Sequence, residues 1–526
     1  MIGYGPISTL GYTSMAVALQ QPPASCNSKG EIKMNGLVSA MLSEDTLTNN
    51  GAVTHSTSSN FNVDLFFLAG ACRNVKEEEI HTLLSKSYGQ DPIKTLKIIF
   101  WAGDIRGGAG ERRFFTVALN WLLANHKEDL YKYLSYVPEF SRWDVLFQLD
   151  DDKVLDYICQ EVKNGNSLLC KWLPRKVTTT DRRKREHKKG KTVTTTIVKT
   201  KRTVKNAFAS KVRHRLGWTP KQYRKWLVEH SNVVETKMCA KLWKEIEYSQ
   251  VPSVAMNKYN KAWVRNDADR FNNYLESVKK GETKINAGAI FPHDIISSAI
   301  GNCYINPSLI KDANIVQWEN LPNYMVDGSI IPVCDLSGSM TWENNALAMK
   351  ISVALGIYIS ERNQGPFKDA FITFSEKPCM HLLSGNLRDR MTQMRNADMG
   401  YNTNLCKVFD LILSKAQAYH ISESEMPKTV LIISDMEFDE ATEGKTNFQS
   451  IKAKYQTAGY NCPNLVFWNV NGRVGNVPVK YADNGTALVS GASPSILKSI
   501  LGNEINPVSM MDKVIETERY SFINAD

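Results

Sequence analysis

The sequence IIPVCDLSGSM, at residues 330–340, decides the fold of the C-terminal part of the chain. Its apolar first half is typical of a short buried strand. The strand ends in the carboxylate of Asp335, and the following turn carries the hydroxyls of Ser337 and Ser339. Ligands of open α/β sheets bind at the carboxyl ends of the strands. Mg²⁺ prefers oxygen ligands, commonly one or two carboxylates with other oxygens and water. The stretch therefore predicts one side of a divalent-metal site.

The sequence offers two more oxygen donors further along the chain, next to other predicted elements of the same α/β fold. Thr403 precedes an apolar helical pattern, and Asp435 follows the apolar run at 429–434. An Asp-x-Ser-x-Ser motif with a later Thr and Asp resembles the metal-ion-dependent adhesion site of von Willebrand factor A domains. The resemblance implies that the ion, Mg²⁺ or another divalent cation, is held by Asp335, Ser337, Ser339, Thr403 and Asp435, and that an acidic group of a protein partner completes its coordination. The motif at 335–339 alone also fits an ordinary strand-to-helix turn.

Strand and helix patterns alternate through residues 325–503, which predicts an α/β doubly wound sheet with helices on both faces. Pro332 conflicts with this expectation, because proline is disfavoured in a central strand. Residues 504–526 are expected to be a C-terminal segment that returns to the preceding helical domain. The predicted strands lie at 330–335, 370–375, 379–383, 430–434, 465–469 and 487–490.

Residues 56–324 are predicted to be helical. Asp91-Pro92 and Thr219-Pro220 are helix-start signals with proline at the first helical position, and Ser141 has the capping-box spacing to Asp144. Nine of the eleven tryptophans lie between Trp101 and Trp318. In a helical domain they are expected in the core more often than as stacking platforms for bases. The pattern suggests stacked helical hairpins without a strict sequence repeat.

A glycine-rich turn at 103–113 carries Arg106, Arg112 and Arg113. Free backbone N–H groups at such a turn favour anions, and the arginines are candidates to grip phosphate oxygens. The turn is not a P-loop, because Gly-x-x-x-x-Gly-Lys-Ser/Thr is absent. The alternative is a tight turn whose arginines form salt bridges with neighbouring helices.

Four short motifs occur in a set order: Asp-Ile-Arg-Gly-Gly at 104–108, Ile-Glu-Tyr at 246–248 with Val-Pro-Ser at 251–253, Phe-Pro-His-Asp at 291–294, and Ser-Asp-Met-Glu-Phe-Asp at 434–439. Together with the adhesion motif they resemble uncharacterised proteins of plants, fungi, bacteria and viruses related to the TROVE module of the Ro autoantigen. The resemblance covers about residues 60–515. It implies a multidomain chain, in which an α-helical HEAT-like repeat array, open or closed into a monomeric ring, is followed by a von Willebrand A domain. It also implies a non-catalytic RNA-binding role, for single-stranded ends or structured non-coding RNA.

Positive charge is concentrated in one insert. The chain carries a net charge of +10, but residues 175–215 hold 16 Lys and Arg against two acidic residues, so the remainder is slightly acidic. The insert reads as two β-prone flanks around a charged tip, a projecting hairpin that suits phosphate contact. The alternatives are a solvated or disordered charge run and a nuclear-localisation or chaperone signal. The predicted RNA-binding residues are Arg106, Arg112, Arg113, Arg182, Arg183, Lys184, Arg185, Lys188, Lys189, Lys191, Lys201, Arg202, Lys211, Arg213 and Arg215.

Composition restricts the remaining classes. The chain has no apolar run of 18 or more residues, so no membrane span is expected. The start of the sequence shows no secretory signal. Ten dispersed cysteines without a CxxC pair fit reduced thiols in the cytoplasm, with the nucleus as the alternative if the insert is a localisation signal. Residues 1–55 are rich in small polar residues and are expected to form a poorly ordered or lightly packed arm.

No catalytic set is found in the sequence. Nine histidines include no HExxH pair, and Ser337 has no Gly-x-Ser-x-Gly context. Three functions remain. The favoured one is an RNA-binding ring whose metal module recruits an acidic protein group, and the second is a protein-interaction adaptor without RNA. The least expected is a Mg²⁺-dependent hydrolase that uses Glu437 and Asp439 beside Asp435.

Overall fold

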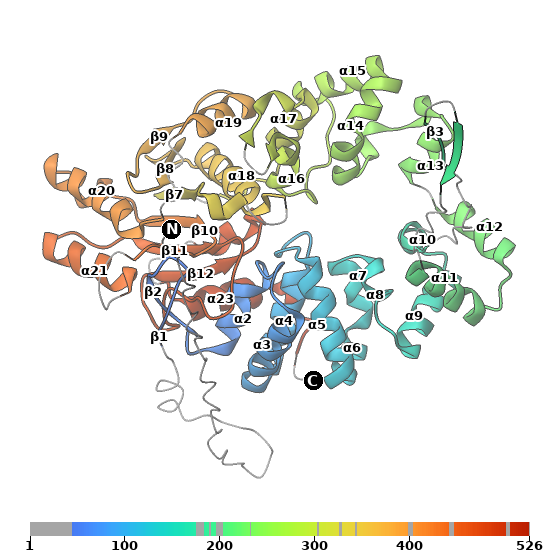
Figure 1. The fold of residues 1–526 in the computed structure, drawn as a ribbon, viewed down its shortest axis with the longest axis horizontal. Helices are drawn as coiled ribbons and strands as arrows, with labels where there is room; N and C mark the ends of the chain where they lie inside the picture. Colours follow the sequence, from blue (N-terminus) through green and yellow to red (C-terminus); the bar gives the residue numbers. More distant parts are fainter. Residues whose placement is uncertain are drawn as a thin grey trace, which may run out of the picture.

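The computed structural model describes two regions, a helical region and an α/β domain (Figure 1). None of the helices it describes is long and apolar enough to cross a membrane. The described residues are 45–174, 184–188, 191–195, 203–231, 233–301, 304–325, 329–341, 345–397, 403–440, 446–500 and 505–524.

The α/β domain is built on a six-stranded mixed sheet with strand order β12-β11-β10-β7-β8-β9. All neighbours are parallel except the edge strand β9, which is antiparallel to β8. The central strands are apolar and buried on both faces, as is typical of parallel sheets covered by helices. The strands are β7 (Ile330–Asp335), β8 (Ala370–Phe374), β9 (Met380–Leu382), β10 (Thr429–Ser434), β11 (Asn464–Asn469) and β12 (Thr486–Ser490).

Pro332 is accommodated in β7 by the register of the sheet. It pairs with Leu431 of β10, but the pairing of β7 with β8 begins only at Val333. At Pro332 the strand is therefore paired on one side, as an edge strand is, and edge positions tolerate proline.

The α/β domain also contains the long helices α18 (Leu347–Arg362), α19 (Leu387–Asn396), α20 (Leu405–Ala418) and α21 (Asn447–Ala458). α18 is buried along almost its whole length. It packs on β7 and β10 with one side and on α16 (Pro292–Ile296) of the helical region with another, so it needs apolar residues all round. α18 thus joins the two regions.

The helical region contacts the α/β domain at both of its ends. At its start, α2 (Phe61–Ala69) packs on β12, and near its end α16 packs on α18. Between them the chain runs away from the sheet and returns (Figure 1). The longer helices are α3 (Glu77–Gln90), α4 (Pro92–Gly103), α5 (Arg112–Asn125), α9 (Asp152–Lys163), α11 (Thr203–Arg215), α12 (Pro220–His230), α14 (Ser253–Asn266), α15 (Ala268–Lys279) and α17 (Asp312–Glu319).

Two predicted helix starts are confirmed, and one is wrong. The side chain of Asp91 accepts from the N–H of Lys94 at the start of α4, and Thr219 forms a capping box with Gln222 at the start of α12. Ser141 does not cap a helix; α8 (Trp143–Leu146) begins after Arg142, with no side-chain cap. The Asp144 carboxylate instead accepts from the Arg142 guanidinium at 2.9 Å.

The last described segment lies against α4 of the helical region. α23 (Pro507–Ile515) contacts both β12 and α4. Lys94 pairs with Asp512 at 2.8 Å, and Arg519 pairs with Asp104, which is fully buried. These contacts link residues more than 400 positions apart in the chain.

Residues 45–55, which the composition assigned to a lightly packed arm, form a hairpin on the α/β domain. Strands β1 (Asp45–Leu47) and β2 (Val53–His55) pair antiparallel. The hairpin also bridges to the domain through Gly51 with Asp439 and through His55 with Val477. In the basic insert, β3 (Lys184–Lys188) pairs antiparallel with β4 (Lys191–Thr195).

Candidate metal centre

The predicted metal ligands Asp335 and Asp435 are placed by two neighbouring strands. β7 and β10 are parallel and in register, with Cys334 opposite Ile433. Asp335 is the last residue of β7, and Asp435 directly follows β10. Because carboxyl ends of parallel strands meet at one edge of the sheet, both carboxylates lie at the edge where ligands bind.

Asp335 is fully buried and held by two hydrogen bonds. One oxygen accepts from the Ser337 N–H at 2.9 Å, and the other accepts from the Ser434 hydroxyl at 2.6 Å. Burial raises the pKa of Asp335, these hydrogen bonds oppose the rise, and the nearby charge of Asp439 adds to it. Ser434 was not predicted, because in the sequence it reads only as the last residue of a strand.

The serine hydroxyls connect the two carboxylates. The oxygens of Ser337 and Ser339 are 3.0 Å apart. Burial, together with the smaller effect of the Asp335 charge, raises the pKa of Asp435 to about 7. A hydrogen bond with the Ser339 side chain opposes the rise. Asp335, Ser337, Ser339 and Asp435 therefore form one connected group.

Thr403 joins this group through the loop that follows β10. Its N–H donates to Asp439 at 2.7 Å, and its hydroxyl donates to the carbonyl of Glu437 at 2.7 Å. Met436 in the same loop has a φ of 67°, which is uncommon for a residue with a long side chain. Strained backbone of this kind is frequent at functional sites.

The N-terminal hairpin also contacts this loop. The Asn50 side chain donates to the carbonyl of Glu437 at 2.7 Å, and the N–H of Asn49 donates to the Glu437 carboxylate at 2.6 Å. Asn50 is also 3.4 Å from the Thr403 hydroxyl. Sequence reasoning missed these contacts because the polar composition of this stretch carries no pattern that predicts its partner.

The donor set fits a hard divalent cation. Two buried carboxylates and three hydroxyls are the oxygen ligands that Mg²⁺ takes. Within the described ranges neither Asp335 nor Asp435 forms an ion pair with a basic side chain. Buried carboxylates without a counter-charge are costly, and a bound cation removes that cost.

The alternative hydrolytic site expected from the sequence would use Glu437 and Asp439, which lie in the loop that follows Asp435. Glu437 pairs with Arg473 at 3.2 Å, and Asp439 accepts from Thr403. Both acids are thus engaged by the protein.

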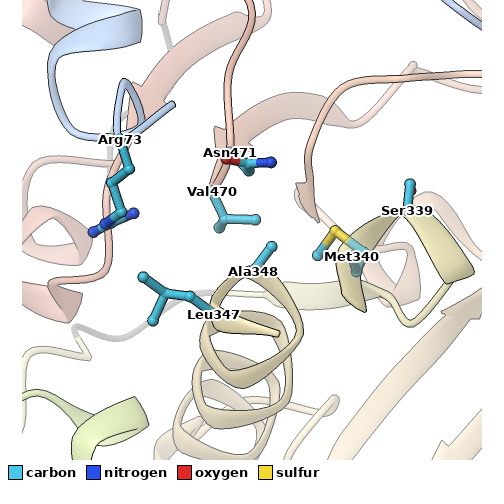
Figure 2. A pocket seen from close by; sticks show the side chains of 7 residues that line it. All are labelled: Arg73, Ser339, Met340, Leu347, Ala348, Val470 and Asn471. Carbon is cyan, nitrogen blue, oxygen red and sulfur yellow. The ribbon is translucent and has the colours of Figure 1, made fainter. Parts of the chain in front are cut away.

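A small pocket lies beside the turn after β7 and is lined by Ser339 and Met340 of that turn and by Arg73 of the helical region. Figure 2 shows Arg73 and Ser339 on opposite sides of this pocket, with Leu347 and Asn471 between them. The Nε of Arg73 is 2.9 Å from Glu111, whereas its Nη1 is buried and has no hydrogen-bond partner among the described residues. A cationic group thus flanks the candidate metal centre.

The arginines of the glycine-rich turn are engaged within the protein. Arg106 donates to the carbonyl of Glu139 at 2.7 Å, Arg112 pairs with Asp144 at 2.6 Å, and Arg113 donates to the carbonyl of Cys72 at 2.9 Å. Arg112 thus forms a salt bridge of the kind that the alternative interpretation expects, whereas Arg106 and Arg113 bond to backbone carbonyls. Arg106 and Arg112 remain exposed to solvent.

The basic residues of α11 are also engaged. Lys211 pairs with Asp150, Arg215 pairs with Asp152 and with Asp156 at 2.7 Å, and Arg213 donates to the carbonyl of Trp218 at 3.1 Å. Of the other candidates, Lys184, Arg185, Lys188 and Lys191 belong to β3 and β4. Arg182, Arg183, Lys189, Lys201 and Arg202 lie outside the described residues.

Comparison with known proteins gives a family but no activity. A family model described as a domain of unknown function (DUF2828) matches residues 48–140 and 147–327, and a second domain of unknown function (DUF7788) matches residues 329–521. An uncharacterised protein, L728, of Acanthamoeba polyphaga mimivirus is 28% identical over 511 residues, which cover 90% of this chain and 87% of that protein. The crystal structure of the Ro protein of Deinococcus radiodurans aligns with a TM-score of 0.38 and 11% identity, over 88% of this chain and all of that chain.

Proposed function

We propose that this chain, which belongs to the family defined by the domain of unknown function DUF2828, holds a divalent cation in its α/β domain. The cation is offered to an acidic group of a protein partner. The observation that carries the proposal is the burial of Asp335 and Asp435 beside the linked hydroxyls of Ser337 and Ser339. Neither carboxylate has a basic partner among the described residues. The group is a chelating set of oxygens that lacks positive charge.

Each residue has a role in this proposal. Asp335, Asp435, Ser337, Ser339 and Thr403 hold Mg²⁺. Ser434 orients Asp335 through its hydrogen bond, and Asp439 orients Thr403. When bound, the cation supplies a coordination position for a carboxylate of the partner.

Arg73 supports an anionic partner. It lines the same small pocket as Ser339; its Nε is 2.9 Å from Glu111, and its buried Nη1 has no hydrogen-bond partner among the described residues. A carboxylate that binds beside the cation would gain a charge-assisted hydrogen bond from a guanidinium at this position. The site is one of attachment, and no catalytic residue is assigned.

The experiment is affinity capture with the full chain. The wild type in Mg²⁺ is expected to retain a protein that is released by EDTA and is not retained by Asp335→Ala or Ser337→Ala. Asp410→Ala is the matched control, because Asp410 is a partly exposed carboxylate that pairs with Lys454 on the outside of the domain. Capture that is equal in EDTA, or equal in the Asp335→Ala variant, would refute the proposal.

RNA binding is the second candidate, and the basic insert favours it. Residues 175–215 carry 16 Lys and Arg against two acids. On α11, Lys211 and Arg215 are neutralised by Asp150, Asp152 and Asp156. The interaction with phosphates is therefore assigned mainly to the β3–β4 hairpin.

The two functions separate by variant. Neutralising Lys184, Arg185, Lys188 and Lys191 is expected to weaken retention of single-stranded and structured RNA and to leave Mg²⁺-dependent capture unchanged. Asp335→Ala is expected to do the reverse. Failure of the wild type to bind either RNA at low salt would leave the metal-dependent adaptor as the function.

A further inference from the structure

A groove of about 450 Å³ lies in the helical region, between α14, α15 and the start of α17. This size is within the range of binding sites for small ligands or a few inserted side chains. It is separate from the candidate metal centre, because none of the five predicted metal ligands lines it. The α/β domain contributes Arg388, at the start of α19, to its wall.

The floor of the groove is apolar. Phe271 and Leu275 of α15 and Ile310 and Ala313 near α17 are buried beneath it. Val264 of α14 stands in the wall and is 49% exposed. An aliphatic side chain that enters the groove removes the exposed surface of Val264 from water, which stabilises binding.

The rim of the groove is positive. Lys261, Arg265 and Lys311 are exposed and form no ion pair within the described ranges. The acidic residue of the lining is Asp312, and Arg388 lies 3.3 Å from it. The rim therefore presents unpaired positive charge around an apolar floor.

We propose that this groove binds an acidic segment of a partner protein, with aliphatic side chains inserted between α14 and α15 and carboxylates on the rim. An amphipathic segment that lays its apolar face in a groove is a common mode of peptide recognition, and complementary charge around the groove adds rate and specificity. Lys261, Val264 and Arg265 are spaced i, i+3, i+4 on α14, so they share one face of the helix.

The lining favours a peptide over a nucleic acid. Sequence-tolerant binding of single-stranded nucleic acid uses exposed aromatic faces on which bases stack. The aromatic residue of this groove is Phe271, and it is fully buried beneath the surface. The exposed apolar side chain of the lining is the aliphatic Val264, which suits contact with Leu, Ile, Val or Met of a peptide.

The test selects peptides from a random library displayed on phage, with the immobilised full chain as target. Enriched peptides are expected to combine Asp or Glu with aliphatic residues. Fluorescence polarisation with an enriched peptide is then expected to show binding weakened by about tenfold or more in Lys261→Glu with Arg265→Glu, because opposite charges become like charges. EDTA is expected to have no effect, which separates this groove from the metal centre.

Matched controls keep the test decisive. Lys244→Glu and Lys280→Glu reverse exposed charges of the helical region that lie outside the groove. Both variants are expected to bind the peptide like the wild type. Val264→Asp and Lys311→Glu change the groove at two different elements. If the Lys261→Glu, Arg265→Glu double variant does not fold, one of these single variants replaces it in the binding test. Unchanged affinity in the folded groove variants overturns the proposal. So does a library without acidic enrichment, or single-stranded RNA that binds the wild type and is lost in these variants.

Discussion

The Ser434 hydroxyl donates a 2.6 Å hydrogen bond to Asp335, which ties the last residue of β10 to the last residue of β7. The same hydroxyl oxygen accepts from the N–H of Met436 at 3.1 Å. One side chain therefore fixes both the carboxylate of β7 and the loop that carries Asp435. The geometry of the candidate metal centre therefore depends on Ser434 as well as on the predicted ligands.

Replacing Ser434 with alanine is expected to destabilise the protein by about 1–3 kcal/mol, because a buried carboxylate oxygen loses its partner. Chemical denaturation measures the change. The control is Ser414→Ala at an exposed position of α20, where the hydroxyl donates to the carbonyl of Leu411. This change is expected to alter stability by less than about 0.5 kcal/mol. Equal effects of the two variants would mean that the contact with Asp335 contributes nothing.

The C-terminal segment is expected to be held by Arg519. In Arg519→Ala, the fully buried Asp104 loses its cationic partner and retains the Tyr520 hydroxyl at 3.0 Å. Breaking one partner of a buried pair costs about 3–5 kcal/mol; Arg519 is itself 35% exposed, so a loss below that range is expected. Thermal unfolding is the measurement, with the exposed Lys513→Ala on α23 as the control. A midpoint equal to that of Lys513→Ala would contradict the assignment.

His293 is expected to make stability depend on pH. Burial lowers its pKa from 6.5, Asp294 opposes this shift, and Arg73 and Lys350 add to it. The unfolded chain therefore binds the proton more readily, so stability falls as pH drops through about 6.5. The effect is absent at higher pH, where His293 is neutral in both states.

Denaturation at pH 7.5 and 5.5 checks this expectation. His293→Leu is expected to lose less stability between the two values than the wild type. The exposed His214→Leu is expected to behave like the wild type. An unchanged pH dependence in His293→Leu would show that another group carries the effect.

RNA binding by the β3–β4 hairpin is expected to respond to salt. For single strands the logarithm of the affinity falls with the logarithm of salt concentration by about 0.7 per neutralised phosphate. Alanine at Lys184, Arg185, Lys188 and Lys191 is expected to reduce that slope by up to about 3. Fluorescence anisotropy over a salt series measures it, and alanine at Lys221, Arg224 and Lys225 of α12 is the control. A slope that the hairpin variant leaves unchanged would remove the insert from the RNA interface.

Much of the candidate metal centre was predictable because the apolar pattern of the sequence shows where each strand ends. Apolar runs that stop at Asp335 and Ser434 predict buried strands, and the parallel topology brings their ends together. The buried tryptophans were predictable for a similar reason: Trp101, Trp263 and Trp318 are fully buried in the helical region, as expected of core residues.

Other features depend on partners that are distant in sequence. Nothing near Asn50 indicates that it lies on the loop containing Glu437, and nothing near Asp104 indicates Arg519. Asp144 was interpreted as part of a capping box because of its spacing, but ion pairing with Arg112 and Arg142 competes for the same carboxylate. Local patterns predict elements and caps, whereas contacts between elements need the fold.

The most direct test of the central claim is isothermal titration of the metal-free full chain with Mg²⁺. The wild type and Asp410→Ala are expected to bind one ion, with a gain in stability of about 2.7 kcal/mol at a concentration of about 100 times the Kd. Asp335→Ala and Ser337→Ala are expected to show neither the heat of binding nor the gain in stability. A wild type without Mg²⁺ binding, or an Asp335→Ala variant that binds as the wild type does, would contradict the assignment of the metal centre.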